Sequence, residues 1–148
     1  NMSDIQAALG VSQLRRADAL LERRRAVARR YLEGFAGSPW IEPPAVAPGN
    51  AHTWHLFTIR LRLERLRIDR DRFLAALTEE NVGSSVHFIP VYRHPFFARY
   101  GVGPESFPAC EDYYARCISL PLYPDMSDSD VDDVVEAVQR IAEYHRAD

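Results

Sequence analysis

One stretch of the chain gathers side chains that could bind a polar, negatively charged ligand. It spans residues 82–97 and reads VGSSVHFIPVYRHPFF. Its β-branched run favours a strand, and Pro90 ends that strand because proline has no amide proton to donate. The candidate binding residues at the strand end and in the next turn are His87, Phe88, Tyr92, Arg93 and His94. Hydrogen-bond donors, an aromatic face and a fixed positive charge are together suited to an anionic ligand.

The chain contains no lysine, and all 18 of its basic residues are arginine. A guanidinium stays protonated in proteins and cannot replace an amine in imine formation. Chemistry that needs a lysine imine therefore cannot be completed by this chain alone. Asp112, Asp132 and Asp133 fall on predicted helices as surface charges, so we expect no carboxylate pair for acid–base catalysis.

Two other groups of residues could form binding sites. His52 and His55 are three apart on a predicted strand, which places them on opposite faces and argues against a metal site. The arginine-rich helix at 15–30 could suggest nucleic-acid binding. Its arginines spread around the helix, and the net charge is −3, so a solvated face is the preferred interpretation. We expect no nucleic acid and no metal.

The composition is that of one ordinary globular domain, with 148 residues and 47% hydrophobic content. No apolar run has membrane-spanning length and no signal peptide is visible, so we expect a cytoplasmic protein without a membrane partner. Cys110 and Cys117 are predicted to lie two turns apart on one helix. That separation is too great for a disulfide, so both are expected as free thiols.

The hydrophobic patterns predict an α/β fold, a small sheet with helices packed on one face. Capping boxes at Ser3 and Ser127 mark the starts of the first and last helices. The other predicted helices cover residues 20–35, 69–80, 95–100 and 108–117. The predicted strands cover residues 52–63, 82–89 and 118–122, and the proline-rich stretch 38–50 is expected to be irregular.

Four segments together resemble the C-terminal domain of the DegT group of aminotransferases, which are fold-type I enzymes dependent on pyridoxal phosphate. They are NMSDIQAALGVSQL at 1–14, HTWHLFTIRL at 52–61, the 82–97 stretch, and ISLPLYPDMSDSDV at 118–131. Their order and spacing match the family along almost the whole chain. The HTWHLF and PLYPDMS forms are similar to the branch that makes 4-amino-4-deoxy sugars of the aminoarabinose or perosamine type.

The resemblance implies a division of the chain and of its roles. Residues 1–37 would form a helical segment at the dimer and interlobe contacts, and residues 52–148 the α/β lobe. The imine-forming lysine would belong to an N-terminal cofactor domain absent from this chain. The resemblance places Asn1 on the cofactor phosphate, although Asn1 could instead merely precede the Ser3 cap.

The same resemblance assigns the 82–97 stretch to the substrate. His87 and Phe88 match a His–aromatic pair that lines the nucleotide-sugar pocket, where Phe replaces the more usual Tyr and removes a hydroxyl. Tyr92 would contact the sugar or base. Arg93 and His94 would meet the diphosphate, because a guanidinium fork suits phosphate oxygens. From the residues alone, a histidine in a strand such as His87 is more often structural than a ligand, and Arg93 or His94 could be a solvated turn residue.

The expected function is transfer of an amino group, from glutamate, to a nucleotide-linked keto sugar by a pyridoxal-phosphate-dependent homodimer. In that enzyme this chain would line the substrate pocket and would be inactive by itself. The alternative is a non-catalytic nucleotide-sugar-binding or interaction module that partners a separate lysine-bearing chain.

Overall fold

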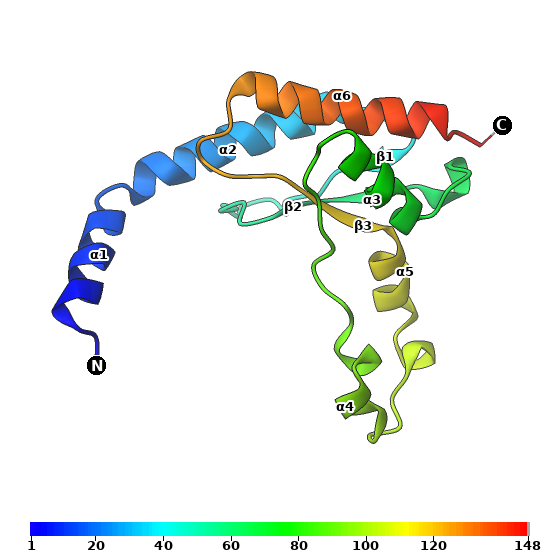
Figure 1. Cartoon of the computed structure of the whole chain (residues 1–148), viewed down its shortest axis with the longest axis horizontal. Coiled ribbons are helices and arrows are strands. Elements are labelled where there is room, and N and C mark those ends of the chain that lie inside the picture. The colour runs from blue at the N-terminus through cyan, green and yellow to red at the C-terminus, as the bar shows by residue number, and fades with distance from the viewer. Residues whose placement is uncertain (148) are drawn as a thin grey trace.

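The computed structural model describes residues 1–147, apart from the side chain of Ala98. A small central sheet carries a layer of helices, and two extensions project from this body (Figure 1). One extension is the N-terminal helix, and the other contains α4. The predicted α/β class is therefore confirmed.

The sheet is antiparallel, with strand order β1-β2-β3. Its strands are β1 (Ile41–Glu42), β2 (Phe57–Leu61) and β3 (Cys117–Leu120). Along β2 the side chains of Phe57, Ile59 and Leu61 are buried, whereas Thr58 and Arg60 are half-buried. This alternation is the pattern expected of a sheet with one face on the core.

Two long helices, α2 (Ala17–Gly34) and α6 (Asp128–Tyr144), lie side by side over the sheet. They approach closely at Gly34, where an added Cβ would lie 2.9 Å from the methyl carbons of Val135. Ser127 starts α6 with the predicted capping box. The side chains buried between helices and sheet include Val27, Tyr31, Phe35, Phe57, Ile59, Ile118, Val131, Val138 and Ile141.

The remaining helices are shorter or less embedded. They are α1 (Asp4–Leu14), α3 (Arg70–Glu79), α4 (Pro95–Ala98) and α5 (Pro108–Arg116). The Ser3 capping box of α1 forms as predicted, yet α1 buries none of its residues. Asp69 starts α3 by accepting the amide proton of Arg72 at 2.9 Å. None of the helices among residues 1–147 is both long and apolar enough to cross a membrane.

The structure corrects the strand predicted at 82–89. That segment forms only one isolated bridge, in which the amides of Ser85 and Ser119 each donate to the other's carbonyl, at 3.1 and 2.8 Å. Beyond the bridge the chain leaves the sheet, and Phe88 is 75% exposed. The β-branched pattern therefore predicted an extended segment correctly but a strand wrongly. Among the described residues, only Ser85 of this segment pairs with another strand.

Three other boundaries differ from the predictions. Strand β2 starts at Phe57 rather than at residue 52, because Trp54 adopts a positive φ of 52° that interrupts an extended chain. Strand β1 lies within the stretch expected to be irregular. Helix α5 ends at Arg116, so Cys117 begins β3 and is buried, while Cys110 is exposed. The two cysteines are free, as predicted, but they do not share a helix.

Candidate substrate site

All five predicted substrate residues lie in one projection, here called the arm and defined as residues 83–107. The arm leaves the sheet near Ser85, runs out to α4 and returns to α5 (Figure 1). Tyr92 and Arg93 belong to a 3-10 helix, Val91–Arg93, that follows Pro90. The proline thus ends the extended segment as predicted, and the turn residues follow it directly.

Tyr92 and Arg93 both bind the carboxylate of Glu111 on α5, and we call these three residues the clasp. The Tyr92 hydroxyl donates to Oε1 at 2.8 Å, and Arg93 Nε donates to the same oxygen at 2.9 Å. Arg93 Nη2 donates to Oε2. The hydrogen bond from Arg93 lowers the pKa of Glu111, and the carboxylate in turn raises the pKa of Arg93. The clasp joins the outgoing limb of the arm to α5.

Aromatic rings contact both arm residues of the clasp, Tyr92 and Arg93. The Tyr92 ring stacks on Phe107, with centroids 4.9 Å apart and planes at 17°. The Arg93 guanidinium carbon lies 5.4 Å from the ring centroid of Tyr114, and that of Arg70 lies 4.8 Å from the same centroid. Such contacts favour a guanidinium electrostatically. Arg70, Arg93, Glu111 and Tyr114 also line a small cavity of about 240 Å³.

His87 and Phe88 lie nearer the sheet end of the arm. Their rings meet edge to face, with centroids 4.7 Å apart. His87 is half-buried, and its Nδ1 atom is buried without a hydrogen-bond partner among the described residues. The hydroxyl oxygen of Ser84 is likewise buried without a hydrogen-bond partner among the described residues. Buried polar atoms are normally hydrogen-bonded, so this end of the arm has unused hydrogen-bonding capacity.

Two predicted residues stand apart from the clasp and from this pair. The side chain of His94 is exposed and makes no capping hydrogen bond to α4. Asn1 is exposed at the start of the chain, and in Figure 1 that end lies away from the arm. The structure thus gathers residues 87–94 on one projection but does not bring Asn1 to them.

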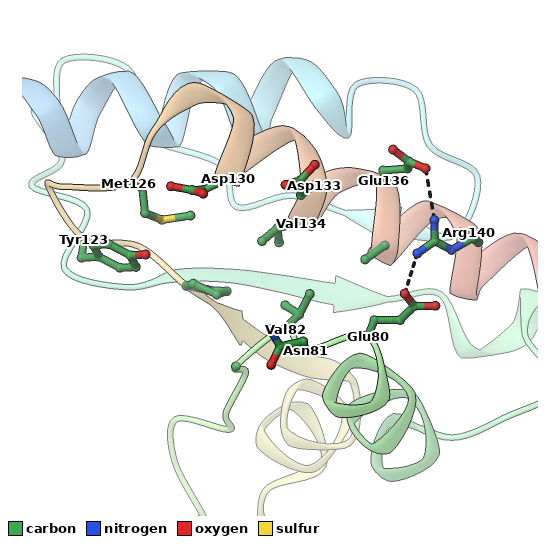
Figure 2. Close-up of a pocket in the computed structure, with 13 residues that line it drawn as sticks. Glu80, Asn81, Val82, Tyr123, Met126, Asp130, Asp133, Val134, Glu136 and Arg140 are labelled. Carbon is green, nitrogen blue, oxygen red and sulfur yellow. Dashed lines mark hydrogen bonds and ion pairs between the residues drawn. The ribbon is translucent and has the colours of Figure 1, made fainter.

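A larger cavity, of about 680 Å³, lies elsewhere, between α6, the end of α3 and the loop before α6 (Figure 2). Its charged residues are Glu80 at the end of α3 and four residues of α6, namely Asp130, Asp133, Glu136 and Arg140. Arg140 donates to Glu80 at 2.5 Å and to Glu136 at 3.1 Å. Sequence reasoning missed this cavity because its walls are far apart in sequence. No residue of 87–94 lines it.

Three arginines of the arginine-rich segment 15–30 contact parts of the body outside α2. Arg23 donates to Asp128 at 2.9 Å and Arg30 donates to Asp132 at 2.6 Å. Arg24 donates to the carbonyl of Trp54 at 2.9 Å. Among the described residues, no group of three His, Cys, Asp or Glu side chains is placed to hold a metal ion.

The chain belongs to the DegT/DnrJ/EryC1/StrS aminotransferase family, whose model matches residues 1–139. It is 45% identical over 143 residues to SpsC of Bacillus subtilis, a spore coat polysaccharide biosynthesis protein, covering 95% of this chain and 37% of SpsC. The chain therefore spans little more than a third of that relative's length.

Solved structures agree with this assignment. Spr1654 of Streptococcus pneumoniae, known in PMP and PLP forms, superposes with a TM-score of 0.89 at 31% identity, covering 97% of this chain and 36% of its own. DesV of S. venezuelae, solved with a ketimine intermediate, gives a TM-score of 0.85 at 33% identity, covering 97% of this chain and 37% of its own. The small sheet and its helices thus have the fold of part of these two structures.

The residues of this chain do not fit pyridoxal phosphate as a covalently held group. An internal imine needs a lysine, and the chain has none. Asn1 offers an amide near the start of α1, where a helix N-terminus favours a phosphate, but one such contact is not a cofactor site.

Proposed function

We propose that this chain is the substrate-side lobe of a pyridoxal-phosphate-dependent aminotransferase that acts on a nucleotide-linked keto sugar. Family membership supports the transamination, and the relation to SpsC supports a sugar pathway. The single observation that carries the proposal is the arm, which holds half-buried His87, the exposed Phe88 ring and the Arg93 guanidinium on one segment of the chain. Those groups match the sugar, base and diphosphate of such a substrate.

In the complete protein, pyridoxal phosphate would supply the electron sink for moving the amino group, on a lysine that this chain lacks. His87 would hydrogen-bond to the sugar or the diphosphate, and Phe88 would offer a face to the sugar or base. Arg93 and His94 would bind the diphosphate, and Tyr92 would orient the arm beside it. Asn1 would donate to the cofactor phosphate of a second protomer in a homodimer.

The preferred substrate class is a 4-keto hexose or pentose linked to a nucleotide, with glutamate as amino donor. This choice rests on the HTWHLF and PLYPDMS segments, which resemble the aminoarabinose and perosamine branch. Within the first of these segments Trp54 and Phe57 are core residues, because Phe57 is fully buried and the two ring centroids lie 5.5 Å apart.

The test separates the two half-reactions of the complete protein that carries this chain. His87→Ala should raise the KM for the nucleotide sugar about tenfold, the loss expected for one hydrogen bond, and leave the glutamate half-reaction unchanged. His55→Ala is the matched control, because His55 is exposed and lies outside the arm. Equal losses in both half-reactions would make His87 structural.

A wild-type complete protein that binds nucleotide sugars without accepting an amino group would overturn the proposal. It would support a non-catalytic binding module instead. Binding and turnover should therefore be measured on the same preparation.

A further inference from the structure

Glu111 fastens the arm to the body. It lies in the first turn of α5, and its side chain is 21% exposed. Helix α5 is itself joined to the body through Arg116, which donates to Glu64 at 2.8 Å. A carboxylate at this place therefore connects the outgoing limb of the arm to a helix that contacts the body.

The hydrogen bonds of Glu111 define the orientation of the Arg93 guanidinium. The carboxylate occupies the edge formed by Nε and Nη2. The Tyr114 ring lies beside the same guanidinium, 5.4 Å from its central carbon. Three contacts to two partner residues leave the long Arg93 side chain few rotamers, and Nη1 makes no hydrogen bond among the described residues.

An arginine held in this way is prepared to bind an anion. A planar guanidinium offers donors on more than one edge, so a carboxylate on one edge does not occupy the others. The Arg93 side chain is 42% exposed, which allows a ligand to reach its remaining donors. Ordering the side chain before binding removes an entropic cost that the ligand would otherwise bear.

We propose that Glu111 is a positioning residue for substrate binding: it holds the Nε and Nη2 edge of Arg93, so that the Nη1 edge of the same guanidinium binds the diphosphate of the nucleotide sugar. The inference rests on the proposed function and deepens it. Glu111 itself touches neither the substrate nor the reacting atoms. Its effect passes through Arg93.

The experiment is a double-mutant cycle in the complete protein, with the KM for the nucleotide sugar as readout. Glu111→Gln should raise this KM about tenfold, the order of one charge-assisted hydrogen bond. Arg93→Ala should raise it further, and the double variant should match Arg93→Ala because Glu111 acts only through that residue. The glutamate half-reaction should stay at the wild-type rate in all three variants.

Two further variants serve as controls for the double-mutant cycle. Asp112→Asn removes the neighbouring carboxylate of α5, whose partner is Arg116 rather than the arm, and should leave the KM unchanged. Arg93→Lys keeps the charge but loses the planar fork, so it should raise the KM nearly as much as Arg93→Ala. It also tests the inference if Glu111→Gln does not fold.

Three results would overturn the inference: an unchanged KM for Glu111→Gln, a double variant whose losses are additive, or a wild-type KM for Arg93→Lys. Each of these results counts against the inference only when the wild-type complete protein is active. An inactive wild type would remove the proposed function itself, so the two failures are distinguishable.

Discussion

The body and the arm are stabilised in different ways. In the body, apolar side chains from α2, α6 and the sheet are buried against one another, and Tyr31, Phe57 and Ile118 have no exposed surface. In the arm, Phe88, Phe96 and Tyr100 are more than half exposed, and the polar clasp joins the outgoing limb to α5.

The two regions therefore differ in role: the body determines the stability of the fold, and the arm carries the predicted substrate residues. Apolar burial supplies most of the free energy of folding, so the body sets the stability. Segments with few buried apolar contacts open at lower free energy, and binding sites are commonly drawn from them. The arm combines that lower stability with the side chains that we assign to the substrate.

The largest expected effect is on the body. Phe57→Ala should lower the free energy of unfolding of the chain by about 3–5 kcal/mol, because the ring packs on Tyr31 at 4.9 Å and on Trp54 at 5.5 Å between centroids. Phe96→Ala is the matched change in the arm and should cost less than about 1 kcal/mol, since Phe96 is 59% exposed. Urea unfolding measures both, and similar losses would contradict the comparison.

A second pair of variants compares two helical glycines. Gly34→Ala should lower the free energy of unfolding by about 1–3 kcal/mol, because its new methyl group would overlap Val135 on α6. Gly10→Ala meets nothing within 4 Å in α1 and should raise helix stability by about 0.5–1 kcal/mol. Thermal unfolding with circular dichroism measures both. A tolerated Gly34→Ala would show that α2 and α6 separate easily.

The smallest expected effect is the acid sensitivity of the clasp. Arg93 lowers the pKa of Glu111 below its ordinary value of 4.5, so the folded form favours the ionised carboxylate. Its contribution is therefore present above pH 4.5 and is lost as the pH falls through the lowered pKa. NMR amide signals of the arm, followed from neutral to acid pH, should shift in this range. In Glu111→Gln that shift should vanish, and its persistence would assign the titration to another group.

Local signals in the sequence predicted the elements that local chemistry determines. Ser3 and Ser127 both form the capping boxes expected from their spacing to Gln6 and Asp130. The periodic apolar face of the last helix is buried as predicted. The family segments also located the candidate substrate residues on one projection, although their binding roles stay predictions.

Features that depend on distant partners were not predictable. The 82–89 segment has the composition of a strand, but only Ser85 finds a partner, Ser119, 34 positions away. Glu111 resembles any surface glutamate in a helix, and its pairing with Arg93 depends on how the arm returns to α5.

The most direct test is a crystal structure of the complete protein with a bound nucleotide sugar. The account predicts that the sugar or the diphosphate lies within hydrogen-bonding distance of His87, with Arg93 still held by Glu111. A nucleotide sugar bound in a pocket that includes no residue of 87–94 would contradict it.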